Sequence, residues 1–211
     1  MDAAFVRSWV EEFASAIDEE RDYLTQLDAA IGDADHGINM QRGFSAAVTK
    51  LAAAGSSPPG TVLTGVGGTL ISTVGGAAGP LYGTAFREAG KAMGDGEEFG
   101  PAELLVALRA ALDGIRRLGA ATLGDKTMVD AFAPAVDAFA GELDAGGTVT
   151  TASARAREAA DEGMRATVPL QARKGRASYL GPRSVGHQDP GATSTALLFA
   201  ALERVARRFQ P

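Results

Sequence analysis

Apolar residues recur at helical spacing along most of the chain, and this pattern constrains the fold more than any other feature. Phe5, Trp9 and Phe13 are the first example, because residues four apart lie on one face of a helix. Runs that alternate apolar or β-branched residues with polar ones, which are typical of half-buried strands, are absent from the sequence. We therefore predict an all-α protein.

Eight helical segments can be placed between the glycine and proline signals that end and begin helices. They cover residues 3–20, 38–54, 61–73, 80–93, 150–166 and 190–208, and two more begin at Pro101 and near Met128. Because the connections are short, neighbouring helices should run antiparallel, in an up-and-down bundle or a closed helical barrel. Pro134 predicts a local kink or a delayed start of the helix near Met128.

The chain has 211 residues, of which 45% are hydrophobic and 22% charged, and this predicts one soluble globular domain spanning residues 1–211. The formal net charge of −6 provides no basic surface for nucleic acid and disfavours an anionic membrane. The absence of cysteine excludes disulfides and thiolate metal sites. No stretch resembles a signal peptide or is long enough to span a bilayer, so we expect a cytoplasmic protein.

Three aspartates, Asp28, Asp33 and Asp35, are concentrated in one short stretch, and Gly32 and Gly37 flank the last two. Glycine disfavours helix and permits positive φ, so we predict a turn here. In an extended turn Asp33 and Asp35 point the same way, and Asp28 can fold back onto them. Converging carboxylates repel one another unless a cation lies between them, and their oxygens suit Mg²⁺ or Ca²⁺.

Other interpretations of this acidic stretch can be compared with the metal site. An EF-hand starting at Asp33 fails, because Gly37 and Phe44 would occupy its fifth and twelfth positions. A solvated acidic loop that caps the next helix remains an alternative. Mg²⁺ usually binds few protein carboxylates together with substrate phosphates, so a magnesium site also predicts a phosphate ligand.

Two further loops carry residues suited to phosphate. The glycine-rich stretch 72–80 precedes a helix, and such a turn can offer backbone N–H groups to an anion. Tight helix packing through small residues explains the same glycines equally well. The segment 171–181 contains Arg173, Lys174 and Arg176 in an otherwise acidic chain, and these cations face either phosphates or solvent.

The segment 119–127 imitates a P-loop, but Asp125 separates the glycine from the lysine and a predicted helix comes before it, so we reject that interpretation. The loops with these acidic, glycine-rich and basic residues are nevertheless every second connection between the predicted helices. Alternate connections of an up-and-down bundle lie at the same end. Residues 28–39, 74–79, 118–127 and 171–191 can therefore meet at one rim. Acidic, glycine-rich and basic loops together predict a metal–nucleotide site.

Five motifs in order along the chain resemble the nucleotide-binding L subunits of the dihydroxyacetone kinase family. They are Asp28 with IGDADHGINM at 31–40, VGGAAGP at 74–80, GDKTM at 124–128, QARKGRASYLG at 171–181 and GHQDPGA at 186–192. The resemblance covers essentially the whole chain, and it extends to the C-terminal domain of the ATP-dependent one-chain kinases. It implies a closed barrel of eight antiparallel helices with ADP or ATP at one rim.

The resemblance also implies roles for individual residues. Asp28, Asp33 and Asp35 would hold two Mg²⁺ ions and, with Arg176, would form the catalytic group. The implied nucleotide contacts are His36, Gly37, Ile38 and Asn39, the phosphate turn at Ala77 and Ala78, the base pocket at Gly119 and Met128, Arg176, and Asp189, Pro190 and Gly191, which would close the site. The family often has serine at the position of Ala78, so one hydroxyl contact is missing here.

The implied activity is phosphoryl transfer that depends on partner chains. A dihydroxyacetone-binding subunit would present the acceptor, and a phosphotransferase-type multiphosphoryl subunit would rephosphorylate bound ADP. The alternatives are a metal-dependent phosphohydrolase using the same aspartates and a non-enzymatic, nucleotide-loaded co-regulator of a transcription regulator. The sequence leaves open whether free ATP is the donor, whether erythrulose replaces dihydroxyacetone, and the oligomeric state.

Overall fold

The computed structural model describes residues 1–209, which form nine α-helices and one 3₁₀ helix, η1. The elements are α1 (Ala3–Glu19), α2 (Arg21–Ile31), α3 (His36–Ala53), α4 (Pro59–Thr73), α5 (Ala78–Met93), α6 (Pro101–Gly119), α7 (Val129–Asp144), α8 (Val149–Ala166), η1 (Arg176–Ser184) and α9 (Pro190–Arg208). Within residues 1–209 there is no strand, apart from one isolated bridge between Asp2 and Glu98. The predicted all-α fold is confirmed.

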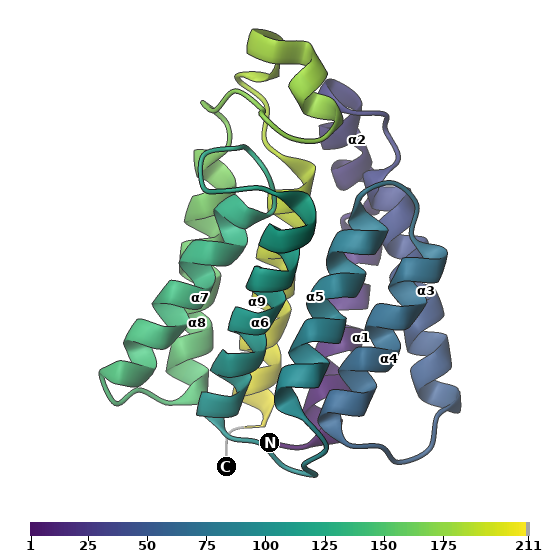
Figure 1. The fold of residues 1–211 in the computed structure, drawn as a ribbon, viewed down its shortest axis with the longest axis vertical. Helices are drawn as coiled ribbons and strands as arrows, with labels where there is room; N and C mark the ends of the chain where they lie inside the picture. The colour runs from purple at the N-terminus through teal and green to yellow at the C-terminus, as the bar shows by residue number, and fades with distance from the viewer. Residues whose placement is uncertain (210–211) are drawn as a thin grey trace.

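Eight long helices form a closed ring, and α2 is the additional short helix beside one rim (Figure 1). Each of α3 to α8 packs against the next α-helix in the chain, and α9 packs back against α1, which also contacts α3. The ring therefore closes as the predicted up-and-down barrel. The α2–α3 turn, the α4–α5 turn, the α6–α7 loop and the α8–α9 segment with η1 all lie at the same end (Figure 1).

The helix starts follow the sequence signals. Pro59, Pro101 and Pro190 are the first residues of α4, α6 and α9, where the missing N–H of proline breaks no helical hydrogen bond. Two expectations need correction. Residues 21–31 lie outside every predicted helical segment, but Arg21–Ile31 forms α2, with Leu24 buried. Helix α7 begins at Val129 and runs through Pro134, so the delayed start is wrong.

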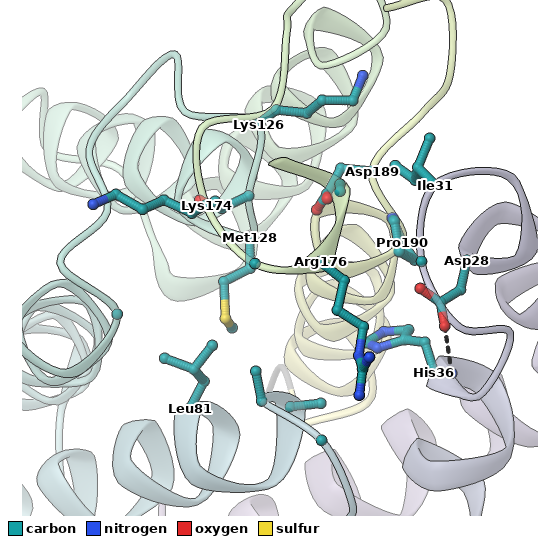
Figure 2. Close-up of a pocket in the computed structure, with 18 of the residues that line it drawn as sticks. Asp28, Ile31, His36, Leu81, Lys126, Met128, Lys174, Arg176, Asp189 and Pro190 are labelled. Atoms are coloured by element: carbon teal, nitrogen blue, oxygen red, sulfur yellow. Dashed lines mark hydrogen bonds between the residues drawn. The ribbon is translucent and has the colours of Figure 1, made fainter. Parts of the chain in front are cut away.

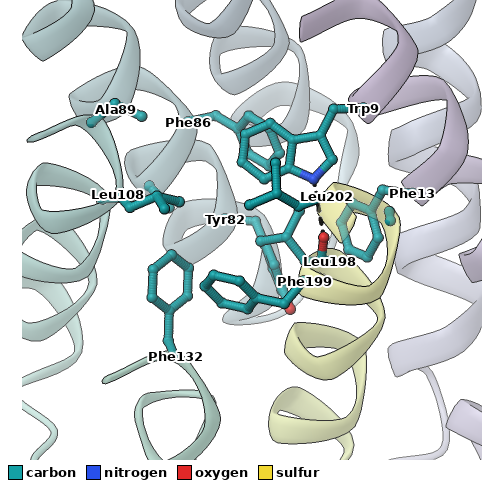
Figure 3. Packing of buried hydrophobic residues seen from close by; sticks show 14 of the residues in the cluster. Trp9, Phe13, Tyr82, Phe86, Ala89, Leu108, Phe132, Leu198, Phe199 and Leu202 are labelled. Atoms are coloured by element: carbon teal, nitrogen blue, oxygen red, sulfur yellow. Dashed lines mark hydrogen bonds between the residues drawn. The ribbon is translucent and has the colours of Figure 1, made fainter. Parts of the chain in front are cut away.

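Aromatic side chains fill the centre of the barrel (Figure 3). The rings of Phe13 and Phe44 meet edge to face at 4.6 Å between centroids, and those of Phe132 and Phe199 do so at 5.1 Å. The indole Nε1 of Trp9 donates a hydrogen bond to the carbonyl of Leu198 (3.0 Å), so its buried polar atom is paired. Full burial of each such side chain contributes roughly 1.5–3 kcal/mol to folding.

Glycines allow α4 and α5 to approach closely. A Cβ added to Gly67 would lie 2.5 Å from the carbonyl oxygen of Gly83, and one added to Gly60 would lie 2.2 Å from that of Gly94. These backbones would have to separate if any larger residue replaced the glycines. In the part of the chain that the structure describes, no helix combines the length and the apolar character that crossing a membrane requires.

Candidate functional site

A cavity of about 580 Å³ opens at the rim where the special loops meet (Figure 2). It is lined by residues from the α2–α3 turn, the α4–α5 turn, the α6–α7 loop and the segment between α8 and α9. The volume suits a small-molecule ligand. The predicted convergence of the four connections is therefore present.

The acidic cluster forms one side of this cavity. Single carboxylate oxygens of Asp28, Asp33 and Asp35 all lie within 4.8 Å of one another. Asp28 is buried on α2, and its Oδ2 accepts hydrogen bonds from the backbone N–H groups of Asp35 (2.9 Å) and His36 (3.2 Å). Asp28 thereby holds the turn that carries the other two aspartates, and this all-oxygen donor set fits a hard divalent cation.

Backbone geometry makes this convergence possible. A Cβ at Gly32 would lie 2.0 Å from Oδ1 of Asp28, so a larger residue there would displace the carboxylate. Ala34, between Asp33 and Asp35, has φ of 61°, in the left-handed region that residues other than glycine rarely adopt. Such local strain is common at ligand sites.

The glycine-rich turn between α4 and α5 also lines the cavity. Gly76 has φ of 64°, and α5 begins directly afterwards at Ala78 without a side-chain hydrogen bond to its first N–H groups. Those N–H groups can donate hydrogen bonds to an anion, which the positive end of the helix dipole also attracts. Asn39 lies against Gly75, and its Oδ1 accepts a hydrogen bond from Arg42 (2.8 Å).

The segment between α8 and α9, which includes η1, carries the positive charge of the site and is called the lid below. Arg176 is the first residue of η1, after Gly175 with φ of 63°, and its Nε lies 2.9 Å from Oδ2 of Asp33. The guanidinium is 68% exposed and therefore accessible to a ligand. Lys174 also lines the cavity, whereas Arg173 is exposed outside it and contributes its backbone N–H to the carbonyl of Asp125 (3.0 Å).

The other end of the cavity is apolar. Leu81, Ile115, Ala121 and Met128 line it, together with Gly119 at the end of α6. Figure 2 shows the Met128 side chain directed toward Leu81. Flat apolar walls of this kind suit a planar ring. The cavity therefore combines a charged end with an end suited to an aromatic base.

Burial changes the pKa values of several groups at the site. It raises the pKa of the Asp189 carboxyl to about 7, although the N–H of Ala192 donates to that carboxylate and opposes the shift. It also lowers the pKa of His36 despite the nearby Asp28 and Asp35, so the neutral imidazole is favoured. The Nε2 of His36 forms a hydrogen bond with Ser194 Oγ (3.0 Å), which fixes the ring beside the cluster.

Most of the residues predicted for the site line this cavity. They are Asp28, Asp33, Asp35, His36, Asn39, Ala77, Ala78, Gly119, Met128, Arg176, Asp189 and Pro190. Three other predicted site residues, Gly37, Ile38 and Gly191, are not among the described residues that line the cavity. Gly37 packs against the carbonyl of Arg21 and Ile38 points to solvent. Gly191 lies beside Asp189 and Met128, one layer behind the wall.

Sequence reasoning missed several residues of the cavity. Leu81 and Ile115 line it, but apolar residues in helical segments resemble core residues, and Tyr179 lines it from the exposed basic segment 171–181. Lys126 is also there, although its segment is not a P-loop: α6 precedes it, and its side chain is buried. The lysine within a glycine-containing loop marks the position in the sequence, but the pattern does not predict its role.

Comparison with known proteins agrees with this geometry. Residues 30–204 match the model of the DAK2 domain family. The chain is 43% identical over 200 residues to the PEP-dependent dihydroxyacetone kinase ADP-binding subunit DhaL of Escherichia coli (strain K12), covering 95% of each chain. It is 41% identical to the ADP-binding subunit DhaL of the PTS-dependent dihydroxyacetone kinase of Lactococcus lactis, covering 93% of this chain and 94% of that one.

A solved structure shows the same fold. The dihydroxyacetone kinase of C. freundii, crystallised in complex with AMP-PNP and Mg²⁺, superposes with a TM-score of 0.73 and 26% identity. The match covers 97% of this chain and 34% of that longer protein. The similarity therefore extends over nearly all of this chain and about a third of that kinase.

Proposed function

Because the chain belongs to the DAK2 domain family, we propose that residues 1–211 act as one domain, the ADP/ATP-binding and phosphoryl-transferring subunit of a multi-chain dihydroxyacetone kinase. One observation carries the proposal. The Asp28–Asp33–Asp35 cluster, the uncapped start of α5 and the Arg176 guanidinium surround the charged end of a single cavity whose other end is apolar. That is the arrangement a Mg²⁺-bound nucleoside di- or triphosphate needs.

Each group has a distinct part in the proposed transfer. The three aspartates, whose carboxylate oxygens converge, would hold two Mg²⁺ ions. The ions would supply charge neutralisation on the transferred phosphoryl group. The N–H groups at Ala77 and Ala78 would bind phosphate oxygens, and Arg176 would hold the phosphoryl oxygens through its planar fork. Asp189 and Pro190 would close the site beneath the lid.

The acceptor is proposed to arrive on a partner chain. The cavity lies at the rim of the barrel, and transfer requires donor and acceptor to be held in line at short range. The rim segments 34–39, 77–79 and 173–191 would form much of the interface with a dihydroxyacetone-binding subunit. ADP would stay bound as a cofactor and be rephosphorylated by a phosphotransferase-system subunit, and we propose that this reaction occurs in the cytoplasm. Binding to a transcription regulator would use the same rim.

A reconstitution tests this function. The purified chain is mixed with Mg²⁺, ATP and dihydroxyacetone, with and without the dihydroxyacetone-binding subunit of a related kinase, and dihydroxyacetone phosphate is measured. We expect negligible product from the chain alone and turnover with the partner. Adding the phosphotransferase-type subunit with its phosphoryl donor and only catalytic ADP tests the rephosphorylation step.

Two outcomes would contradict the proposal. Robust phosphorylation of dihydroxyacetone by the chain alone would reveal an acceptor site within it. Steady release of phosphate from ATP without any partner would instead indicate a metal-dependent phosphohydrolase. A variant with Asp137→Ala, an exposed carboxylate on α7 outside the cavity, serves as the control for non-specific effects of charge.

A further inference from the structure

Lys126 is a buried lysine to which the proposed function gives no part. Its side chain is 1% exposed, and its Nζ donates hydrogen bonds to the carbonyl oxygens of Thr167 (2.7 Å) and His187. Its backbone φ is 62°, in the left-handed region that long side chains rarely occupy. A buried cation and a left-handed backbone both oppose folding, and strain of this kind is typically found at functional sites.

The two carbonyls that accept from Lys126 belong to the ends of one segment. Residues 168–186, here called the lid segment, include η1 and Arg176, and Thr167 and His187 lie directly before and after it. The ends also contact each other, because the N–H of Gly186 donates to the carbonyl of Val168 (2.8 Å). The ammonium of Lys126 thus joins the chain entering the lid segment to the chain leaving it.

The same lysine belongs to the loop that forms the apolar end of the cavity. The carboxylate of Asp130 accepts from the N–H groups of Gly124 (2.6 Å) and Thr127 (2.7 Å), which holds the loop rigid around Lys126. Met128, two residues after Lys126, lines the cavity. In Figure 2 the Lys126 side chain points away from Met128. The side chain of Lys126 therefore connects the loop at the apolar end of the cavity to the two residues that flank the lid segment.

We propose that Lys126 is a positioning residue: it ties both ends of the lid segment to the base-pocket loop, so that Arg176 stays over the phosphate end and bound nucleotide is released slowly. This inference rests on the proposed nucleotide site. Burial lowers the pKa of the Lys126 ammonium, and the nearby carboxylates of Asp189 and Asp130 oppose that shift. Binding of the base end and closure of the lid segment are then coupled through one side chain.

Release of nucleotide from the full chain tests the coupling. The dissociation rate of a fluorescently labelled ADP is measured by stopped flow in Mg²⁺ for the wild type, Lys126→Met, Arg176→Ala and the double variant. We expect release at least about tenfold faster from Lys126→Met. In the Arg176→Ala background the same substitution should change release less than about twofold, because the lid has already lost its phosphate contact.

A control separates positioning from loss of stability. Leu63, buried on α4 and outside the rim cavity, is changed to alanine to destabilise the barrel without touching the lid segment, and release should stay at the wild-type rate. If Lys126→Met does not fold, Lys126→Arg takes its place in the cycle, since it keeps the charge but cannot place one ammonium between two carbonyls.

Three results would overturn the proposal. Release could be unchanged in the Lys126 variant, it could accelerate equally with and without Arg176, or it could accelerate as much in Leu63→Ala. Binding of Mg²⁺–ADP to the wild type is measured first and tests the nucleotide site separately. If the wild type binds and only the cycle fails, the proposed function stands and the role of Lys126 does not; if the wild type does not bind, both fall.

Discussion

The guanidinium of Arg176 is paired with the carboxylate of Asp33, Nε to Oδ2, at 2.9 Å. One partner belongs to the lid and the other to the acidic cluster, 143 positions earlier in the chain. Both are partly solvent-exposed, at 68% and 37%, so the pair contributes at most about 1 kcal/mol to stability. A weak pair can be exchanged readily for stronger contacts, with Arg176 binding phosphate and Asp33 binding metal.

The first prediction concerns the metal. Asp33→Ala should weaken binding of Mg²⁺–ADP by about 100-fold or more, because one oxygen ligand of the cluster is lost. The free energy of unfolding should change by less than about 1 kcal/mol, since the ion pair is exposed. Calorimetric titration with ADP in Mg²⁺ and in EDTA measures the first effect, and thermal unfolding measures the second. Full affinity in EDTA would exclude the metal from nucleotide binding.

The second prediction concerns the shape of the lid cation. Arg176→Lys keeps the positive charge but loses the planar fork that binds two phosphate oxygens at once. We expect phosphoryl transfer in the reconstituted system to be at least about tenfold slower, with nucleotide held less tightly. Arg109→Lys, at an exposed arginine on α6 outside both the cavity and the rim segments, is the control and should leave the rate unchanged. Equal rates for Arg176→Lys and the wild type would show that this arginine faces solvent and does not bind phosphate.

Much of the fold follows from local signals. The helix starts at Pro101 and Pro190 were predicted to the residue, because proline at the first position has a direct steric cause. Helix α2 was missed, since Arg21–Ile31 is rich in polar residues and buries few side chains. The left-handed backbone of Ala34 could not be predicted either, because it results from hydrogen bonds between Asp28 and the next turn.

The candidate site was predictable where residue type alone limits the chemistry. Three aspartates beside a glycine turn predict an oxygen-ligand site, and they do converge. The apolar wall at Leu81 and Ile115 was not predictable, because a helical apolar stripe does not indicate which of its residues border a cavity. The burial of Lys126 depends on the carbonyls of Thr167 and His187, which are far from it in the sequence, and no local pattern in the sequence encodes those contacts.

The third prediction is a pH dependence. Burial raises the pKa of Asp189 from 3.8 to about 7 in the folded state. Between these values the folded chain keeps a proton that the unfolded chain has released, so raising the pH favours unfolding, by up to about 1.4 kcal/mol per pH unit. The stability of the wild type relative to Asp189→Asn should therefore fall from pH 4 to pH 7. Denaturant unfolding measures the difference, and a constant difference would contradict the raised pKa.

The fourth prediction restores a missing contact. Ala78 lines the cavity at the start of α5, at a position where the resemblance of the sequence motif to the kinase family leads us to expect serine. Ala78→Ser should strengthen ADP binding about two- to tenfold, since one added hydrogen bond contributes about 0.5–1.5 kcal/mol. Ala54→Ser, on an exposed residue after α3, is the control. Calorimetry that showed no gain at position 78 would place the phosphates away from this turn.

The last prediction tests the close packing of α4 and α5 with two neighbouring glycines. A Cβ at Gly67 would lie 2.5 Å from the carbonyl oxygen of Gly83 and 2.8 Å from the backbone nitrogen of Arg87, whereas a Cβ at Gly68 would meet nothing within 4 Å. Gly67→Ala should therefore destabilise the barrel by about 1–3 kcal/mol. Gly68→Ala should stabilise it by up to about 1 kcal/mol, because alanine favours helix more than glycine does. Thermal unfolding of the two variants should shift in opposite directions; a shift in the same direction would show that α4 and α5 are not held at this separation.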